Sequence, residues 1–291
     1  LAHPTHLQTL DLSQTQISGE GLRVLAGNRR LYSLNLSHTR LQDQALAHLK
    51  NFSRLSNLRL VGTQITGIGL VHLPKLRLRS LDLRTAPITE EGLKAIGKLT
   101  QVRSLLLGGK GITDDGLAHL AGCRGLNSLD LSATAVTGEG LTALKAIPYL
   151  RYVRLPKTVT VSGIKALASL PKITTWDFIA MGVKVTDPWL QAVQGATQIK
   201  TLRLDAKHLS SKAFRVFQSL TGLQQITLET GRKISPAGLR AMVSSRKLKN
   251  LIVNDFQGSI AAWRALLTAP NLTALHVHNQ KIPSAVLRTL A

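Results

Sequence analysis

The heptapeptide GITDDGL at residues 111–117 decides the fold, because close relatives of it recur along the chain. These relatives are QISGEGL at 16–22, QITGIGL at 64–70, PITEEGL at 87–93 and AVTGEGL at 135–141. Each lies downstream of a run in which leucines follow the pattern L-x-x-L-x-L. Self-similarity at a regular spacing is the signature of a repeat architecture.

The residues just before this heptapeptide are similar to a phosphate-binding loop only at first sight. Such a loop needs a glycine, four spacers and then Gly-Lys-Ser/Thr, so that successive backbone N–H groups surround the anion. Here Lys110 is followed by Gly111, and Ser104 stands five residues before Gly109. The motif therefore fails at both ends. A catalytic pair of Asp114 and Asp115 is also disfavoured, because acidic residues recur at this phase in other repeats.

Twelve repeats can be aligned, most of them 24 residues long, with lengths of 23, 25 and 26 around and after the middle. Their first residues are Leu7, Leu31, Leu55, Leu78, Val102, Leu126, Leu150, Ile173, Ile199, Leu223, Leu248 and Leu272. The opening residues LAHPTH match the tail of a preceding repeat. We therefore expect one domain over residues 1–291 that begins and ends within a repeat.

Each repeat reads as a short strand followed by a helix. In the sixth repeat, Leu129 and Leu131 alternate with polar residues, which is the period of a strand. Leu141, Leu144 and Ile147 then follow at helical spacing. One repeat cannot bury its leucines alone, whereas stacked repeats share a continuous core. The pattern predicts an α/β solenoid of about twelve units, with one twelve-stranded parallel sheet on the concave side and helices on the convex side.

Threonines occupy two recurring positions. Thr137, Thr113 and Thr89 precede helical segments that open with acidic residues, so we expect them to be N-caps. A second column stands at the ninth position, where a hydroxyl can bond neighbouring backbone groups. Its members are Thr15, Thr39, Thr63, Thr134 and Thr158.

These repeats resemble leucine-rich-repeat proteins over essentially the whole chain. The motif ITDDGL is similar to the corresponding motif of the cysteine-containing subclass found in F-box substrate receptors, and to that of threonine-bearing bacterial relatives. Threonine replaces the cysteine expected at the ninth position, the repeats are shorter, and no F-box segment is present. The resemblance implies a horseshoe that binds protein partners on its concave face. It does not imply any role in ubiquitin ligation.

The net charge and the cysteine content limit the kinds of partner and compartment that can be expected for this protein. The chain has 37 basic and 15 acidic residues, a net charge of +22, and residues 151–291 carry 20 of the basic ones against 5 acidic ones. Such charge permits binding to nucleic acid, acidic lipid or acidic proteins without choosing among them. Cys123 is the only cysteine, which excludes intrachain disulfides and favours an intracellular protein or one delivered into a cytoplasm. No apolar run approaches the length of a transmembrane segment.

The outward strand positions of the predicted sheet are mixed but net positive. Aspartates are interleaved at Asp11, Asp82, Asp130, Asp177 and Asp205, so the arginines either pair with them on a solvated face or dock an acidic partner. Further cations lie in the segments that lead from each helix to the next strand. Their distribution is better suited to solubility or to non-specific electrostatic attraction than to recognition of nucleotide bases. The candidate partner-binding residues are Arg59, Arg79, Arg84, Arg103, Arg151, Tyr152, Arg154, Lys200 and Arg203.

The seventh and eighth repeats break the pattern. The seventh is one residue short, and the eighth has Trp176 and Phe178 in place of leucines, followed by two extra residues. A bulge on the rim of a solenoid is a common place for a binding loop, which makes Met181 and Val183 candidates for contact with a partner. The alternative is simple repacking, with the two aromatic residues as enlarged core side chains.

No metal, cofactor or catalytic site is predicted. His276 and His278 alternate on one strand, and Asp255 is the nearest acid in the neighbouring repeat, but two histidines are too few for a zinc site. Serine, histidine and aspartate residues fall where the repeat phase puts them. The sequence therefore predicts a non-enzymatic scaffold that recognises a protein, as the recognition portion of a larger or secreted bacterial protein. The alternative is an anion-directed binder of nucleic acid or an acidic membrane, which the scarcity of aromatics on the concave face, Tyr32 and Tyr152, disfavours.

Overall fold

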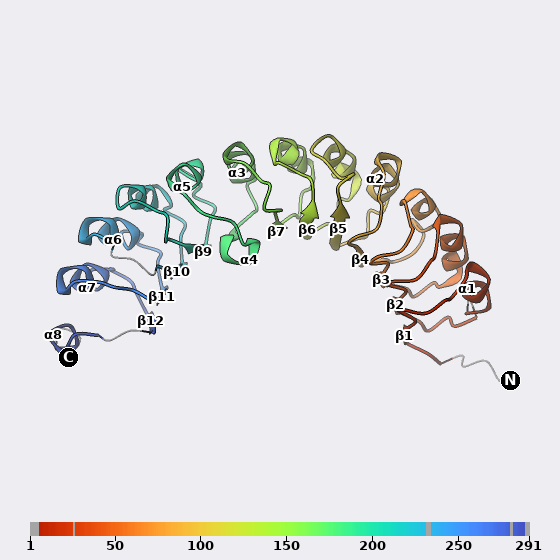
Figure 1. Ribbon diagram of the computed structural model, residues 1–291, viewed down its shortest axis with the longest axis horizontal. Helices are drawn as coiled ribbons and strands as arrows, with labels where there is room; N and C mark the ends of the chain where they lie inside the picture. Colours follow the sequence, from red (N-terminus) through yellow and green to blue (C-terminus); the bar gives the residue numbers. More distant parts are fainter. Residues whose placement is uncertain (1–5, 26, 231–233, 280–281, 289–291) are drawn as a thin grey trace. The chain divides into compact units, whose positions relative to one another are not determined.

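The chain divides into two compact bodies, each built from stacked strand and helix repeats. The computed structural model describes residues 6–25, 27–230, 234–279 and 282–288. The N-terminal body comprises residues 1–163 and the C-terminal body residues 164–291. Within each body, strands line one face and helices line the opposite face, except for the short helix at Phe178–Met181 (α4), which lies on the strand side (Figure 1). Among the helices of these described residues, none has both the length and the apolar character needed to span a bilayer.

The N-terminal body contains a parallel sheet in which the strands follow the order of the chain. Its strands are β1 Thr9–Asp11, β2 Ser33–Asn35, β3 Asn57–Arg59, β4 Ser80–Leu83, β5 Ser104–Gly109, β6 Ser128–Thr134 and β7 Tyr152–Arg154. The helices, several of them 3₁₀, are α1 Gly19–Leu25, η1 Asp43–Asn51, η2 Ile68–His72, α2 Glu90–Gly97, η3 Asp115–Gly122 and η4 Glu139–Ala146. Helix α3, Val161–Ala168, lies at the boundary between the bodies.

The C-terminal body contains a second parallel sheet with the same chain-ordered topology. Its strands are β8 Thr175–Asp177, β9 Thr201–Asp205, β10 Gln225–Glu229, β11 Asn250–Asn254 and β12 Ala274–His278. Its helices are α4 Phe178–Met181, α5 Asp187–Ala192, η5 Ala213–Ser219, α6 Pro236–Met242, α7 Ile260–Leu266 and α8 Ser284–Leu287.

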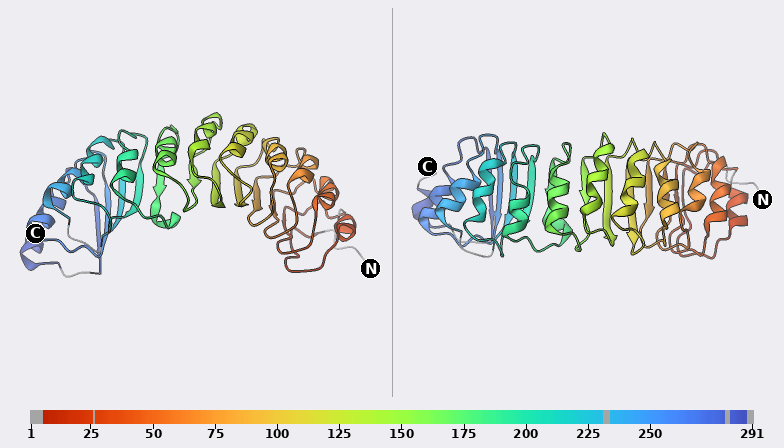
Figure 2. Two further views of the ribbon diagram at one scale, coloured as in Figure 1. Left: turned by 45° about the horizontal axis from the view of Figure 1, so that its top comes forward. Right: turned by 90° about the horizontal axis from the view of Figure 1, so that it is seen from above.

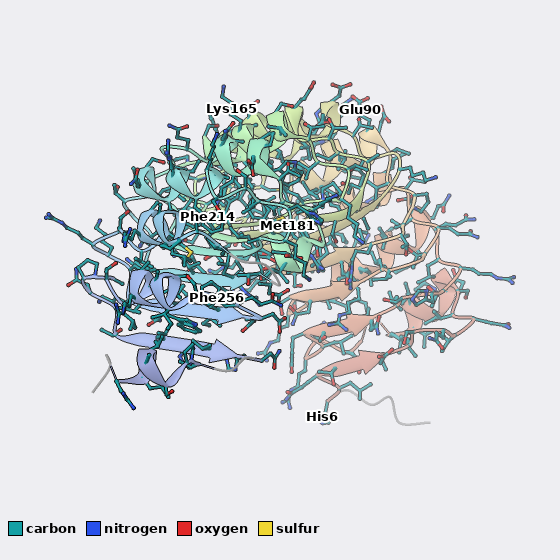
Figure 3. All side chains as sticks on the ribbon, turned by 60° about the vertical axis from the view of Figure 1, so that its left-hand side comes forward. His6, Glu90, Lys165, Met181, Phe214 and Phe256 are labelled. Atoms are coloured by element: carbon teal, nitrogen blue, oxygen red, sulfur yellow. The ribbon has the colours of Figure 1, made fainter. Side chains whose placement is uncertain are left out.

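Strand register follows the repeat register. Every strand begins at the third residue of a predicted repeat, and equivalent leucines pair in adjacent strands, as Leu34 does with Leu58. Both of these leucines are 1% exposed, because the fourth position of each repeat points into the core. Phe214 and Phe256, which are labelled in Figure 3, are also buried. The repeat period therefore builds one shared hydrophobic core within each body.

The prediction of a single twelve-stranded sheet is wrong for the described residues, which form a seven-stranded and a five-stranded sheet. The division falls where the seventh and eighth repeats depart from the pattern. Strand β8 ends after three residues because the Asp177 carboxylate accepts a hydrogen bond from the Ala180 N–H (2.8 Å) and starts the helical turn α4. The strands of the two irregular repeats still pair within their own sheets, β7 with β6 and β8 with β9.

The predicted caps are right at one position and wrong at two. The Thr89 hydroxyl accepts a hydrogen bond from the Gly92 N–H (3.2 Å) at the start of α2, which confirms the N-cap there. Thr137 does not cap η4, whose N-cap is Gly138, and Thr113 does not cap η3, whose N-cap is Asp114. The reason is that Thr137 bonds to the preceding repeat instead of to its own helix.

The ninth-position threonines bond to backbone carbonyls, as the sequence predicts. Thr39, Thr63 and Thr134 each donate their hydroxyl to the carbonyl three residues earlier, at 2.7–2.8 Å. Thr15 does the same, and Thr158 donates to the carbonyl of Val136 in the preceding repeat. Three of these residues are buried, so the hydroxyls satisfy carbonyl oxygens that water does not reach.

Candidate interaction surface

The fifth residue of each repeat lies at the middle of the sheet face. In the N-terminal body this column consists of Asp11, Asn35, Arg59, Asp82, Leu106, Asp130 and Arg154. In the C-terminal body it consists of Asp177, Arg203, Thr227, Ile252 and His276. Because parallel strands pair in register, side chains of opposite charge become neighbours on adjacent strands.

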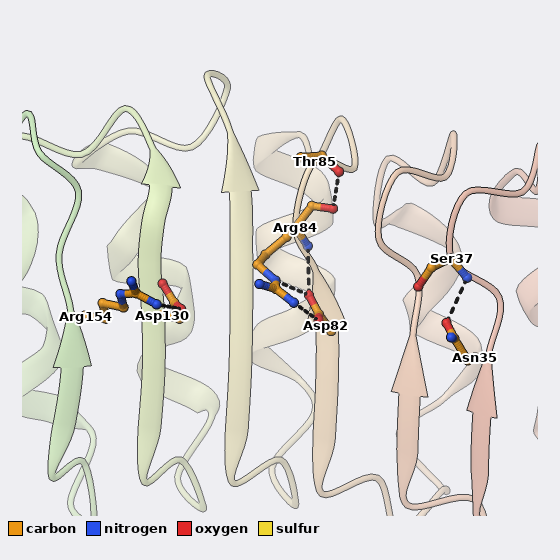
Figure 4. Close-up of polar contacts among 7 residues, drawn as sticks. All are labelled: Asn35, Ser37, Asp82, Arg84, Thr85, Asp130 and Arg154. Atoms are coloured by element: carbon orange, nitrogen blue, oxygen red, sulfur yellow. Dashed lines mark hydrogen bonds and ion pairs between the residues drawn. The ribbon is translucent and has the colours of Figure 1, made fainter. Parts of the chain in front are cut away.

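Arg84 and Asp82 form a two-pronged ion pair on β4 and the residue after it (Figure 4). Arg84 Nη2 lies 2.7 Å from Asp82 Oδ2, and Nε lies 3.0 Å from Oδ1. The Asp82 side chain is only 7% exposed, whereas that of Arg84 is 45% exposed. The hydrogen bond with Asp82 raises the pKa of the Arg84 guanidinium, so the arginine stays charged.

Two further predicted arginines are also held by aspartates. Arg154 Nη1 lies 3.7 Å from Asp130 Oδ2 on the preceding strand (Figure 4). In the C-terminal body, Arg203 Nη1 lies 2.6 Å from Asp177 Oδ2, again on the preceding strand. The alternative of arginines paired with neighbouring aspartates therefore describes Arg84, Arg154 and Arg203.

The other predicted cations are exposed and form no ion pair with any described residue. Four of them lie in the N-terminal body, namely Arg59, Arg79, Arg103 and Arg151. Lys200 lies in the C-terminal body, next to the first residue of β9. Tyr152 is half-buried on β7. The structure thus separates the predicted cations into arginines paired with aspartates and cations that form no ion pair with a described residue.

Arg59 stands in a polar groove of about 390 Å³ on the face of β1 to β4. The lining side chains around this guanidinium are chiefly those of Asp11, Ser33, Asn35, Asn57 and Ser80. Asn35 Nδ2 donates to Asp11 Oδ2 at 2.9 Å, and hydrogen bonds from Ser13 and Asn35 lower the pKa of the Asp11 carboxyl. The sequence prediction considered only charged residues here and missed the Ser/Asn column at the third position of the second to sixth repeats, which is visible in the repeat alignment.

The predicted rim loop is folded differently from expectation. Met181 ends helix α4 and is 5% exposed, so it is a core residue and is not available for contact. Trp176 and Phe178 are buried with ring centroids 5.6 Å apart, as the repacking alternative predicts. Val183 is half-buried beside a cavity of about 390 Å³ that is also lined by Asp205, His208 and Glu229. Sequence reasoning did not connect these three polar residues with the insertion.

The C-terminal histidines form a stacked pair. The rings of His276 and His278 are nearly parallel, with centroids 6.4 Å apart, and both side chains are exposed. Within the described ranges, no group of three or more His, Cys, Asp or Glu side chains is placed to hold a metal ion.

Stacked strand and helix repeats with a leucine core define an α/β leucine-rich-repeat fold. The family model described as a leucine-rich repeat matches residues 3–26, 78–97 and 122–145. Among solved structures, an internalin (inlF) from Listeria monocytogenes is similar in fold, with a TM-score of 0.59 and 19% sequence identity. That similarity covers 94% of this chain and 76% of the internalin chain. No curated protein sequence matches the chain.

Proposed function

We propose that this protein is a non-enzymatic scaffold that binds a protein partner with an acidic surface on the faces of its parallel sheets. The observation that carries the proposal is the groove around Arg59. There an exposed guanidinium, with five N–H donors and no ion-pair partner among the described residues, stands beside neutral hydroxyl and amide groups and the Asp11 carboxylate. A partner carboxylate would meet both a cation and hydrogen-bond donors.

The paired arginines fit the same role. Arg84 shares two N–H groups with Asp82 and keeps other donors for a partner. Arg203 shares one N–H group with Asp177, and Arg154 lies 3.7 Å from Asp130, so an aspartate also orients each of these guanidinium groups. Arg84, Arg154 and Arg203 would therefore contact a partner without losing much side-chain freedom. The exposed cations Arg79, Arg103, Arg151 and Lys200, together with Tyr152, complete the predicted surface, and Val183 is its candidate contact at the rim.

Two finer assignments belong to this proposal. The repeats derive, on this view, from the cysteine-containing subclass with threonine in the cysteine's place, and the hydroxyl bonds of Thr39 and Thr63 support that exchange. Residues 1–291 would act together as one recognition domain.

The test is capture of a partner from a lysate of the source organism, treated with nuclease and kept at about 0.3 M salt, where phosphate-driven binding weakens severely. We expect the wild type to capture a discrete protein, and we expect the Arg59→Glu variant to capture at least tenfold less of it. Arg40→Glu is the matched control, because Arg40 is an exposed arginine in the loop between β2 and η1. Equal capture by Arg59→Glu, or recovery of nucleic acid alone, would count against the proposal.

A further inference from the structure

One edge of the N-terminal sheet carries cations and no carboxylate. It consists of the six segments that lead from a helix into the next strand, namely 28–32, 52–56, 74–79, 98–103, 122–127 and 147–151. All of its cations are exposed, and none forms an ion pair with a described residue. We call these segments the basic edge, and its cations are Arg29, Arg30, Arg54, Lys75, Arg77, Arg79, Lys98, Arg103, Arg124 and Arg151.

The acidic residues of this body lie elsewhere. They belong to strands or to the starts of helices, namely Asp11, Glu20, Asp43, Asp82, Glu90, Glu91, Asp114, Asp115, Asp130 and Glu139. The helix starts lie on the far side of each repeat from the basic edge, because every strand runs in the same direction. Seen from above in Figure 2, connecting segments project on both sides of the helices. Ten cations of this body therefore lie on an edge without carboxylates, whereas the opposite edge has fewer cations, among them Arg40, Lys110 and Lys157. Solubility alone does not require this unequal distribution.

Backbone hydrogen bonds hold the innermost cations of the basic edge in a row. The N–H of Arg103 donates to the carbonyl of Arg79 at 2.8 Å. The N–H of Asn127 donates to the carbonyl of Arg103 (2.8 Å), and that of Arg151 donates to the carbonyl of Asn127 (2.9 Å). Adjacent strands lie about 4.8 Å apart, so the row from Tyr32 to Arg151, five steps long, extends roughly 24 Å.

We propose that the basic edge binds the phosphate backbone of a single-stranded nucleic acid, with Arg79, Arg103 and Arg151 shared between this edge and the border of the protein-binding sheet face. Eight of its ten cations are arginines, whose planar guanidinium can bind a phosphate through two N–H groups. Tyr32 and Tyr149, which are 42% and 58% exposed, lie toward opposite ends of the row. An exposed aromatic ring is a platform on which any base can stack.

The shape of the basic edge favours this ligand over other polyanions. Its cations form a narrow row, whereas binding to an anionic membrane would require a broad basic surface. A flexible single strand can follow a row of this length, which is comparable with the span of about four or more nucleotides bound by single-strand-binding folds. Recognition would be through phosphates, so no base sequence is selected.

The experiment measures binding of the full chain to a fluorescent thymidine 20-mer by anisotropy at several salt concentrations. The edge variant is Arg79→Gln/Arg103→Gln/Arg151→Gln. The control variant, Arg40→Gln/Lys110→Gln/Lys157→Gln, removes the same charge from exposed positions in the loops that follow strands. For single strands, the slope of log K against log salt is about −0.7 per phosphate contact. Removing three contacts should therefore make the slope of the edge variant less negative by about 2, and its affinity should fall at least tenfold.

Circular dichroism and thermal melting establish that each variant is folded. An Arg→Lys variant at the same three positions, which keeps the charge, should retain the slope and bind more weakly than the wild type. Equal weakening by the edge and control variants would show diffuse attraction and overturn the proposal. It would also be overturned if the oligonucleotide does not bind, or if heparin or vesicles containing phosphatidylserine bind through these arginines and the oligonucleotide does not. None of these outcomes depends on whether Arg59→Glu abolishes protein capture.

Discussion

The carboxylate of Asp114 binds Thr137 in the next repeat through two hydrogen bonds to the same oxygen. Asp114 Oδ2 accepts the Thr137 N–H at 2.9 Å and the Thr137 hydroxyl at 2.6 Å, while Oδ1 accepts the N–H groups of Gly138 and Gly140 at 2.9 Å each. Three repeats earlier, Asp43 makes the equivalent four bonds. One carboxylate thus joins two successive helix starts.

Replacing Asp114 with Asn should destabilise the N-terminal body by about 1–3 kcal/mol, because a neutral amide accepts weaker hydrogen bonds and places N–H groups against other donors. Urea denaturation followed by circular dichroism measures the change in free energy of unfolding. The matched control is Asp115→Asn, since Asp115 is exposed and has no side-chain hydrogen bond to a described residue. Similar losses in the two variants would mean that the inter-repeat bonds contribute nothing particular.

The contribution of Asp114 should depend on pH. Burial acts to raise the pKa of this carboxyl, but the four hydrogen bonds outweigh burial and lower the pKa below its ordinary value of 3.8. A carboxylate with a depressed folded-state pKa stabilises the protein above about pH 4, and that stabilisation disappears as the pH falls through the folded-state pKa.

Urea denaturation at intervals from pH 7 to pH 3 therefore checks this prediction. The difference in unfolding free energy between the wild type and Asp114→Asn should stay constant above about pH 5 and shrink below about pH 4. A difference that is unchanged at the lowest pH would show that the Asp114 carboxylate is not the source of the stabilisation.

The repeat period predicts the strands and the leucine core, but it does not predict these inter-repeat bonds. A helix that opens with Asp or Glu after Thr is ordinarily capped within its own repeat, and Thr89 follows that rule. The signal for the other arrangement lies one repeat further on. Asp114 is followed 23 residues later by the sequence Thr-Gly-Glu-Gly, whose glycines leave room for close approach, and Gly138 has a φ of 108° that favours glycine.

The candidate surface is predictable only in part, for a similar reason. Interleaved arginine and aspartate positions in the alignment indicate pairing, and Arg154 and Arg203 do bind the aspartate of the preceding strand. Arg84 instead binds Asp82 of its own strand, two residues earlier, a choice that depends on side-chain conformation. The inserted residues of the eighth repeat indicate a change of backbone, but not that it would bury Met181.

The Cys123 thiol should be inert while the N-terminal body is folded. It is fully buried, its Sγ–H donates to the carbonyl of Ile96 at 3.2 Å, and burial raises its pKa to about 12. Because the thiolate is the reactive species, alkylation by iodoacetamide at about pH 8 should be at least a thousandfold slower than in 8 M urea. Ser53→Cys, at an exposed loop position, supplies a second thiol that should react rapidly in the same folded protein. Rapid native labelling of Cys123 would mean that this body opens readily.

The Asp82–Arg84 pair should show measurable coupling in a double-mutant cycle of the wild type, Asp82→Asn, Arg84→Met and the double variant. Breaking a fully buried pair costs about 3–5 kcal/mol, but half of this guanidinium is solvated, so we expect a coupling of about 1 kcal/mol from urea denaturation. Arg84→Met alone should destabilise more than Arg84→Met in the Asp82→Asn background, because it leaves a nearly buried carboxylate without its cation. The Glu20–Arg23 pair, in which both side chains are largely exposed, is the comparison and should couple more weakly. If the two pairs couple equally, the orientation of Arg84 is not fixed by Asp82. Binding of a partner to Arg84 would then cost the conformational entropy of the arginine side chain.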